Sequence, residues 1–331
     1  MQHSFKNDYL SMQNSNCLKG VFAIAIVICH MFSNRPVSTA FGLGSIITSF
    51  GYLSVAFFAF SSGYGLTISS MTKGKKYFVG YLKKRILPIY LVYIILIGVY
   101  ALFKVATNNK ILVADILKSF LFGQTVVTYG WYIQFIILFY LIYYFIFKNF
   151  DVKKSIVLLA ISTFLYCLVC FFSNKSSTWY ESSWLFVFGS FWAYKKECID
   201  TFFTSSLKKY GLSLLVVSIG FIVAFVFGNS SVFNDVCKIA FKMLSAILFV
   251  TFVLLLVMKI KVAYKPVSFL GNYFFEIYIV QGIFIVLFSD ILVIENTFIY
   301  YLLTLICTVA IAVLISPAVK SINKICRGAK K

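Results

Sequence analysis

Long apolar runs recur along the whole chain and are separated by short polar segments. Many of these runs approach the ~20 residues that a helix needs to cross a bilayer. Ten can be delimited, some of them short or interrupted: 18–34, 46–70, 86–103, 129–147, 155–172, 181–194, 210–228, 239–258, 269–289 and 297–318. The pattern predicts an all-α polytopic membrane bundle of about ten helices. It forms one domain over residues 1–331, with short tails at 1–17 and 319–331.

The composition agrees with a membrane protein, since 61% of the 331 residues are hydrophobic and only 12% are charged. Such a chain cannot bury its apolar side chains in one soluble core. The net charge of +20 does not point to nucleic acid, because the cations follow a topology. If the N-terminus is cytoplasmic, 23 of the 30 Lys and Arg residues fall on cytoplasmic segments and seven on outer ones. This positive-inside distribution predicts that both termini are cytoplasmic.

Local signals suggest where helices begin and end. Proline lacks an amide donor, so Pro36, Pro88, Pro266 and Pro317 are expected near helix ends. Asn16 precedes the first apolar run and suits an N-cap, accepting hydrogen bonds from free amides.

Two segments allow alternatives. Segment 111–127 has apolar residues at near-helical spacing, so it forms either an amphipathic helix on the outer surface or a plain loop. The small residues at 38–40 resemble the end of a cleavable signal, and cleavage there would remove the first helix. The preferred interpretation keeps that helix.

Lys19 and His30 are the strongly polar side chains of the first apolar run. Eleven helical steps of ~100° and ~1.5 Å give three turns plus ~20° and a rise of ~16 Å, so both side chains share one face. A histidine within hydrocarbon indicates a functional site, and its reference pKa of ~6.5 suits proton transfer. A structural hydrogen bond or a ligand contact is the alternative role for His30.

Glu276 is another isolated ionisable residue, with Tyr278 and Gln281 close to it in the sequence. A carboxylate in hydrocarbon needs a partner, so Glu276 should face the bundle interior. Interhelical hydrogen bonding is the alternative role for these three residues. The eight cysteines show no disulfide or metal-site spacing, and no metal is expected.

Residues 73–85 carry six cations with two tyrosines between them. Topology and attraction to anionic lipid headgroups explain such a stretch. The functional alternative is a site for a phosphate-bearing cytosolic molecule such as coenzyme A, because arginine grips phosphate with a bidentate fork.

Several segments together resemble the acyltransferase-3 family, bacterial integral membrane proteins that move acyl groups onto extracytoplasmic glycans or lipids. Residues 19–30 resemble the family's basic residue, ten-residue spacer and histidine. Residues 55–66 resemble its PhePhe…SerGly segment, and residues 77–90 its basic stretch. Residues 129–133 are similar to its tryptophan-bearing helix start, and residues 270–281 to its LeuGly…IleTyrLeuValHis motif.

The resemblance implies roles for individual residues. His30 would be catalytic with Lys19 as its basic partner, and Glu276 is expected to assist them. Arg85 would bind the donor, together with Lys84 and Lys76. The residues expected to contact substrate are Trp131, Tyr278, Gln281 and Ser61, and Ser61, Ser62 or Tyr278 would stabilise an oxyanion.

This chain departs from the family pattern at three positions. Asn16 stands where aspartate is common, Pro88 where a second arginine is common, and Gln281 where histidine is frequent. Arg85 therefore lacks the second arginine that commonly shares donor binding, and Gln281 is not assigned proton transfer. The form expected here is the one without an SGNH esterase-like extension.

The expected function is transfer of an acyl group from cytosolic acyl-CoA to a hydroxyl of an extracytoplasmic glycan, exopolysaccharide or lipid-linked precursor. The acyl group is expected to be acetyl. The partners are the lipid bilayer and the sugar acceptor, with no nucleic acid. The expected location is the bacterial cytoplasmic (inner) membrane, crossed many times. The alternative is an exporter or flippase for a polysaccharide or its lipid-linked unit, with buried His and Glu lining the pathway.

Overall fold

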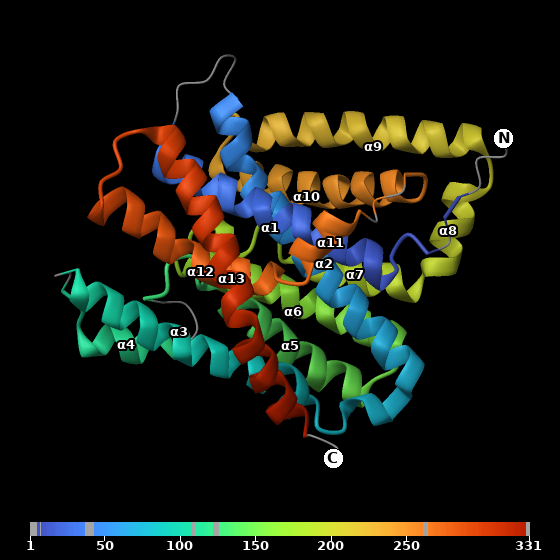
Figure 1. Cartoon of the computed structure of the whole chain (residues 1–331). Helices are drawn as coiled ribbons and strands as arrows, with labels where there is room; N and C mark the ends of the chain where they lie inside the picture. Colours follow the sequence, from blue (N-terminus) through green and yellow to red (C-terminus); the bar gives the residue numbers. More distant parts are fainter. Residues whose placement is uncertain are drawn as a thin grey trace.

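The structure, a computed structural model, describes residues 5–6, 8–36, 43–107, 110–121, 126–260, 262 and 264–328. Within these ranges every regular element is a helix, which confirms the all-α fold (Figure 1). The helices are α1 (Met12–Asn34), α2 (Leu43–Lys73), α3 (Leu87–Ala106), α4 (Val113–Ser119), α5 (Trp131–Asn149), α6 (Val152–Phe172), α7 (Trp184–Tyr194), α8 (Lys196–Thr204), α9 (Leu207–Gly228), α10 (Asp235–Val257), α11 (Lys265–Gly271), α12 (Phe274–Val286) and α13 (Thr297–Arg327). The signal-like residues 38–40 lie outside the described ranges.

Most of these helices are long and apolar enough to span a membrane. Among the described residues, nine helices meet that condition by length and composition: α1, α2, α3, α5, α6, α9, α10, α13, and α12 together with the turn Leu287–Ile291 that continues it. The tenth expected span, 181–194, forms α7, which has 11 residues and so a length of ~16 Å. Its shortness follows from residues 177–183, which form a 3-10 turn and a bend before the helix begins.

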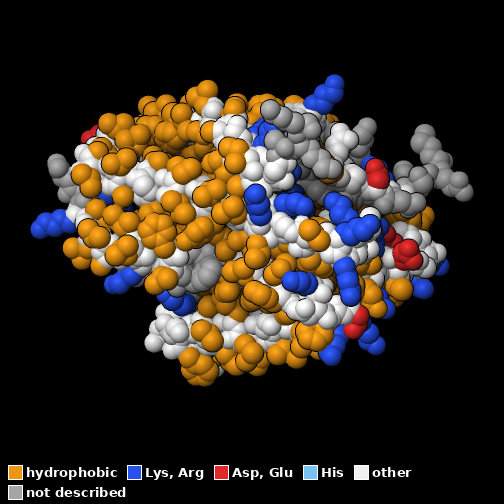
Figure 2. Space-filling view, turned by 90° about the horizontal axis from the view of Figure 1, so that it is seen from below, with side chains coloured by type: hydrophobic (Ala, Val, Ile, Leu, Met, Phe, Trp, Pro, Cys, Tyr) orange, Lys and Arg blue, Asp and Glu red, His pale blue; other side chains and the backbone are white. Residues whose placement is uncertain are grey.

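The outer surface is apolar, as lipid contact requires. Hydrophobic side chains cover much of the face in Figure 2, while most Lys and Arg side chains in that view gather toward one side. On α9, for example, Leu212, Leu215 and Ile222 are all more than half exposed. In water this exposure would be unfavourable, whereas in a bilayer it costs nothing.

Helix starts follow from short polar side chains. Five helices begin after a residue whose side chain accepts a hydrogen bond from a backbone amide of the first turn, namely Ser11, Asp151, Ser206, Asn234 and Asn296. The expectation for Asn16 was wrong, because α1 begins four residues before it. Asn16 lies inside the helix, and its amide nitrogen donates to Asn272 Oδ1 at 3.2 Å.

The prolines divide into two groups. Pro36 follows α1, while Pro88 and Pro266 lie in the first turns of α3 and α11, as expected. The expectation was wrong for Pro317, which lies inside α13, a helix that continues to Arg327. Helices in membranes tolerate an internal proline because neighbouring groups satisfy the freed carbonyls.

Helix α1 lies at the centre of the bundle and contacts α2, α11, α12 and α13. Its approach to α11 is close, because a Cβ on Gly271 would lie 1.7 Å from the Asn16 carbonyl oxygen. Helices α9 and α10 lie side by side at one edge, beside α2 (Figure 1). Segment 111–127 forms a helix only at α4, next to α3, and its residues 122–125 are outside the described part.

Candidate functional site

His30 and Lys19 lie on the uninterrupted helix α1, so the expected three-turn separation along one face holds. His30 is half-buried near the end of the helix. Lys19 is also half-buried, and its ammonium lies 5.2 Å from the centroid of the Phe274 ring on α12. In the described part of the chain no carboxylate lies within 4.0 Å of Lys19.

The imidazole of His30 is held by Gln281 of α12. His30 Nδ1 lies 3.2 Å from Gln281 Oε1. The amide nitrogen of Gln281 donates to the Tyr278 carbonyl at 3.1 Å, which leaves Oε1 to face the histidine. An amide oxygen can only accept, so Nδ1 carries the proton and Nε2 of the neutral ring has a free lone pair. That nitrogen can therefore act as a base.

Tyr129 covers one face of the imidazole. The two rings are parallel within 3°, with centroids 3.6 Å apart. Tyr129 has a backbone φ of 61°, a conformation that is uncommon for residues other than glycine. The hydroxyl of Tyr278 donates to the Tyr129 carbonyl and helps to hold the segment before α5 in this shape. Tyr278 thus touches both Gln281 and Tyr129, the two neighbours of His30.

A cavity of about 500 Å³ opens beside His30. Its walls come from α1, α2, α5, α10, α12 and the loop before α7, and they include Ile26, Cys29, Ser33, Thr48, Ser49, Tyr52, Trp131, Thr178, Glu181, Lys242 and Tyr278. Two of the expected substrate contacts, Trp131 and Tyr278, line this cavity. The Trp131 ring also packs against Trp179, with centroids 6.0 Å apart.

Glu181 and Lys242 form an ion pair in the wall of this cavity. Their charged atoms are 3.4 Å apart, and the Glu181 side chain is only 3% exposed. Ser177 donates a further hydrogen bond to the same carboxylate at 3.0 Å. The Lys242 ammonium lies 5.6 Å from the centroid of the Tyr52 ring. The structure thus places an ion pair near His30, and its two residues come from segments that are remote in the sequence.

The remaining expected site residues lie elsewhere. Glu276 is buried, and its carboxylate accepts a hydrogen bond from Ser316 of α13 at 3.0 Å. It does not line the His30 cavity. Gln281 is fully buried behind the histidine and is not in the cavity wall. Ser61 does not line that wall, and its neighbour Ser62 accepts from Tyr140 at 3.4 Å.

The three expected donor-binding residues come together in a second cavity of about 380 Å³. Lys76, Lys84 and Arg85 line it, together with Lys73, Tyr77, Tyr81 and Arg327. The Arg85 guanidinium lies 5.8 Å from the centroid of the Tyr77 ring. Arg327 reaches this cavity from the far end of α13, a contact that sequence alone did not suggest.

One tyrosine of the basic cavity, Tyr81, has a buried hydroxyl that lacks a hydrogen-bond partner among the described residues. Burial, with a smaller contribution from neighbouring tyrosines, raises the pKa of Tyr81 well above its ordinary value, so its hydroxyl stays protonated. A buried unpartnered donor is unfavourable and indicates a missing partner. With five cations around it, this donor set fits phosphate.

Polar aromatic side chains connect the two cavities through the bundle. Tyr81 stacks near Tyr143 and Tyr144, and Tyr140 donates to Ser62 one helical layer further. Tyr132 lies beyond them and contacts Tyr278, with ring centroids 5.6 Å apart. The packed interior between the basic cavity and His30 therefore contains hydroxyl groups as well as hydrocarbon.

Sequence reasoning missed three residues of this site. Tyr129 lay within a segment already singled out, but its stacking on His30 depends on the fold. Glu181 offered a weak signal as an acidic residue at the edge of an apolar run, and Lys242 as an outer-side cation in an apolar run. Their pairing across 61 residues has no sequence signature.

The site combines a neutral imidazole with a free nitrogen, a cavity of substrate size and a distant basic cavity suited to phosphate. A family model described as an acyltransferase domain matches residues 12–317. No match was found among curated proteins or among solved structures.

Proposed function

Because the chain belongs to the acyltransferase-3 family and is a multi-pass membrane protein, we propose that it transfers an acyl group from cytosolic acyl-CoA to a hydroxyl of an extracytoplasmic glycan or its lipid-linked precursor. The proposed acyl group is acetyl, and the proposed location of the protein is the bacterial cytoplasmic membrane. The observation that carries the proposal is the imidazole of His30, which Gln281 orients beside an open cavity.

The donor would bind from the cytoplasmic side. Its nucleotide phosphates fit the basic cavity of Lys76, Lys84 and Arg85, where Tyr81 has an unpartnered hydroxyl. The pantetheine arm would follow the hydroxyl-containing interior toward His30. In this way only the thioester has to reach the outer half of the bundle, and the charged nucleotide remains outside hydrocarbon.

The chemistry requires one base that also serves as an acid. His30 Nε2 takes the proton of the acceptor hydroxyl as its oxygen attacks the thioester carbonyl. The carbon–sulfur bond then breaks, and the imidazolium returns the proton to the departing thiolate. The products are the acylated glycan and free coenzyme A. Gln281 positions the imidazole by accepting from Nδ1, while the Tyr278 hydroxyl is already engaged by the Tyr129 carbonyl.

The test is acyl transfer by the His30→Ala variant. Membranes that contain the full chain are supplied with radiolabelled acetyl-CoA, and label in glycan and release of free thiol are measured together. We expect a loss of about 10²–10⁴-fold in both, at unchanged protein level. Ser33→Ala, which alters the same cavity wall, is the matched control and should keep its activity.

Near-normal glycan acylation by His30→Ala would contradict the proposal. An exporter or flippase would instead move its glycan without stoichiometric release of coenzyme A thiol. Measuring both products therefore separates the two functions in one experiment.

A further inference from the structure

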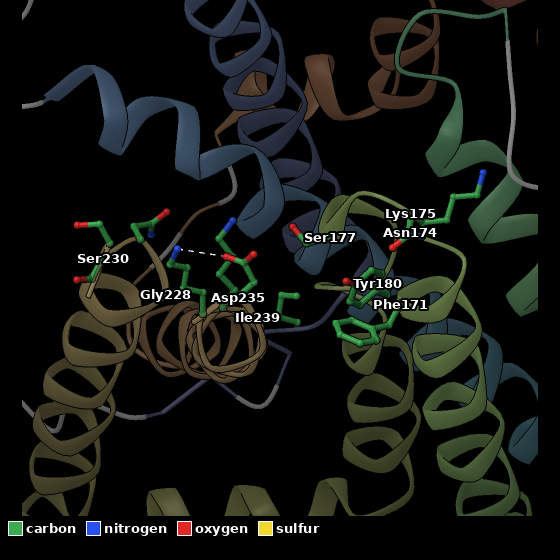
Figure 3. Close-up of a pocket in the computed structure, with 13 residues that line it drawn as sticks. Phe171, Asn174, Lys175, Ser177, Tyr180, Gly228, Ser230, Asp235 and Ile239 are labelled. Carbon is green, nitrogen blue, oxygen red and sulfur yellow. Dashed lines mark hydrogen bonds and ion pairs between the residues drawn. The ribbon is translucent and has the colours of Figure 1, made fainter. Parts of the chain in front are cut away.

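A third cavity, of about 630 Å³, lies between the end of α6 with its following loop and the turn that joins α9 to α10. Figure 3 shows Phe171, Tyr180 and Ser177 on one side of it and Ser230, Asp235 and Ile239 on the other. Its polar groups are serine hydroxyls, the amides of Asn174 and Asn229, and charged side chains. Neither the catalytic base nor the proposed donor site uses these groups.

This cavity is rich in cations on the side of the molecule where cations are scarce. Only seven Lys and Arg residues fall on the segments that the charge distribution assigns to the outside. Three of the seven, Lys175, Lys238 and Lys242, line this one cavity. The positive-inside rule disfavours lysine here, so membrane topology does not explain the cluster.

Local structure explains Lys242, which pairs with Glu181, but it does not explain Lys238. Lys238 lies in the first turn of α10, where the helix dipole disfavours a cation. Its partner Asp235 has a side chain that is 88% exposed, and their charged atoms are 3.3 Å apart. An ion pair with so exposed a partner contributes little stability. Lys238 and Lys242 keep 31% and 25% of their side chains exposed, so both remain accessible to a ligand.

This cavity adjoins the one that contains His30. Lys242 lines both, and its ion pair with Glu181 lies in the wall of the His30 cavity. The loop between α6 and α7 also contributes to both, with Ser177 in the outer cavity and Thr178 in the inner one. A ligand held in the outer cavity would therefore lie beside the cavity of the base.

Resting on the function proposed above, we propose that the outer cavity binds the acceptor and that this acceptor is an acidic glycan, one whose sugars carry carboxylate or phosphate groups. The ammonium groups of Lys238 and Lys242 would bind the anionic group, since lysine offers a strongly hydrated point charge to either anion. Serine and asparagine side chains would meet sugar hydroxyls, and Tyr180 and Phe171 would offer faces to the sugar rings.

The test is direct binding to the full chain in nanodiscs of neutral lipid. The probes are trigalacturonate for carboxylate, a glycerol phosphate trimer for phosphate and maltotriose as the neutral reference. We expect at least one acidic probe to bind about tenfold more tightly than maltotriose, with Lys238→Gln weakening that binding about fivefold. Raising salt from about 0.1 M to about 1 M should weaken it too, because the Debye length falls from ~10 Å to ~3 Å.

Two further variants control for folding and for general charge. Lys242→Arg keeps the ion pair with Glu181 and should retain acidic-probe binding. Lys118→Gln removes another outer-side lysine, on α4 and away from the cavity, and should change nothing.

The proposal would be overturned if maltotriose bound as tightly as both acidic probes, if no acidic probe bound, or if Lys118→Gln acted as strongly as Lys238→Gln. His30→Ala should still bind the acidic probe. Binding without any acyl transfer by the unaltered chain would refute the proposed function while leaving the acidic-glycan site intact.

Discussion

At the scale of single residues, the contact between His30 and Gln281 defines the state of the base. A neutral amide fixes the proton on Nδ1 without adding a charge that would favour the imidazolium. The direction of the amide is set in turn by its own donation to the Tyr278 carbonyl. In metal sites, partners that orient a histidine in this way are worth about 10–100-fold in metal affinity or activity.

We therefore expect Gln281→Leu to lower the turnover of acyl transfer about 10–100-fold, because Nδ1 would lose its acceptor and the ring its orientation. Gln281→Glu retains an acceptor at the same place and serves as the matched variant. The measurement is thiol release at saturating acyl-CoA as a function of pH. A merely structural role for Gln281 would leave the pH profile of the Leu variant unchanged.

Lys19 poses a different question, because its half-buried ammonium has an aromatic ring and no carboxylate close to it within the described ranges. If the charge attracts the donor, Lys19→Ala should reduce activity about tenfold or more, and Lys19→Arg should keep most of it. The KM for acyl-CoA, measured in membranes, distinguishes the two variants. Equal loss in both would show that the shape of lysine, rather than its charge, is required.

The residues of this site that belong to local motifs could be predicted from the sequence. Those that the tertiary fold brings in from remote segments could not. His30 is conspicuous as a histidine in an apolar run, and Lys76, Lys84 and Arg85 belong to one basic stretch of the chain. Glu181 meets Lys242 only because the loop before α7 folds against α10, and no periodicity encodes that approach. The type of residue was enough to identify His30 as the base, but the side chains around it could be identified only from the fold.

At the scale of elements, the pairing of α2 with α7 depends on two small residues. A Cβ on Gly63 would lie 2.0 Å from the Phe186 carbonyl oxygen, and one on Gly189 would lie 2.1 Å from that of Phe60. Without a hydrophobic driving force between helices in lipid, such close backbone contact supplies much of the attraction. This contact helps to hold α7, which is too short to span the bilayer by itself.

Gly63→Ala should push α2 and α7 apart and lower the Tm of the detergent-solubilised protein by about 3 °C or more. Gly65→Ala, two residues along the same helix, meets no atom within 4 Å and is the matched control. It should leave the Tm unchanged or raise it, since alanine favours a helix over glycine by about 1 kcal/mol. Equal Tm values for the two variants would contradict this account of the interface.

Hydropathy located the elements well but not their interruptions. The run 269–289 contains a break between α11 and α12, and the last span extends through Pro317. Both features depend on contacts with other helices, such as the close approach of Gly271 to α1. A scale that averages apolar character along the chain cannot detect them.

At the scale of the whole molecule, the proposed reaction requires the basic cavity and the His30 cavity to face opposite sides of the membrane. The side on which the end of α13 and the turn between α9 and α10 lie depends on α7, because a chain with only nine crossings would place its two ends on different sides. The short helix and the loop that precedes it complete a tenth crossing if the 11 residues of α7 are combined with residues 177–183.

Cys198 tests this crossing because it is exposed and lies on α8, directly after α7. In a Cys237→Ser background, an impermeant maleimide should label Cys198 only after the cells are permeabilised, since α8 should then face the cytoplasm. With Cys198 also changed to serine, Ser231→Cys in the turn before α10 should react in intact cells. Labelling of Cys198 in intact cells would show that α7 returns to the outer side and does not complete a crossing. The cations between α7 and α9 would then lie outside, and the turn between α9 and α10, with its cavity, would no longer be assigned to the outer side.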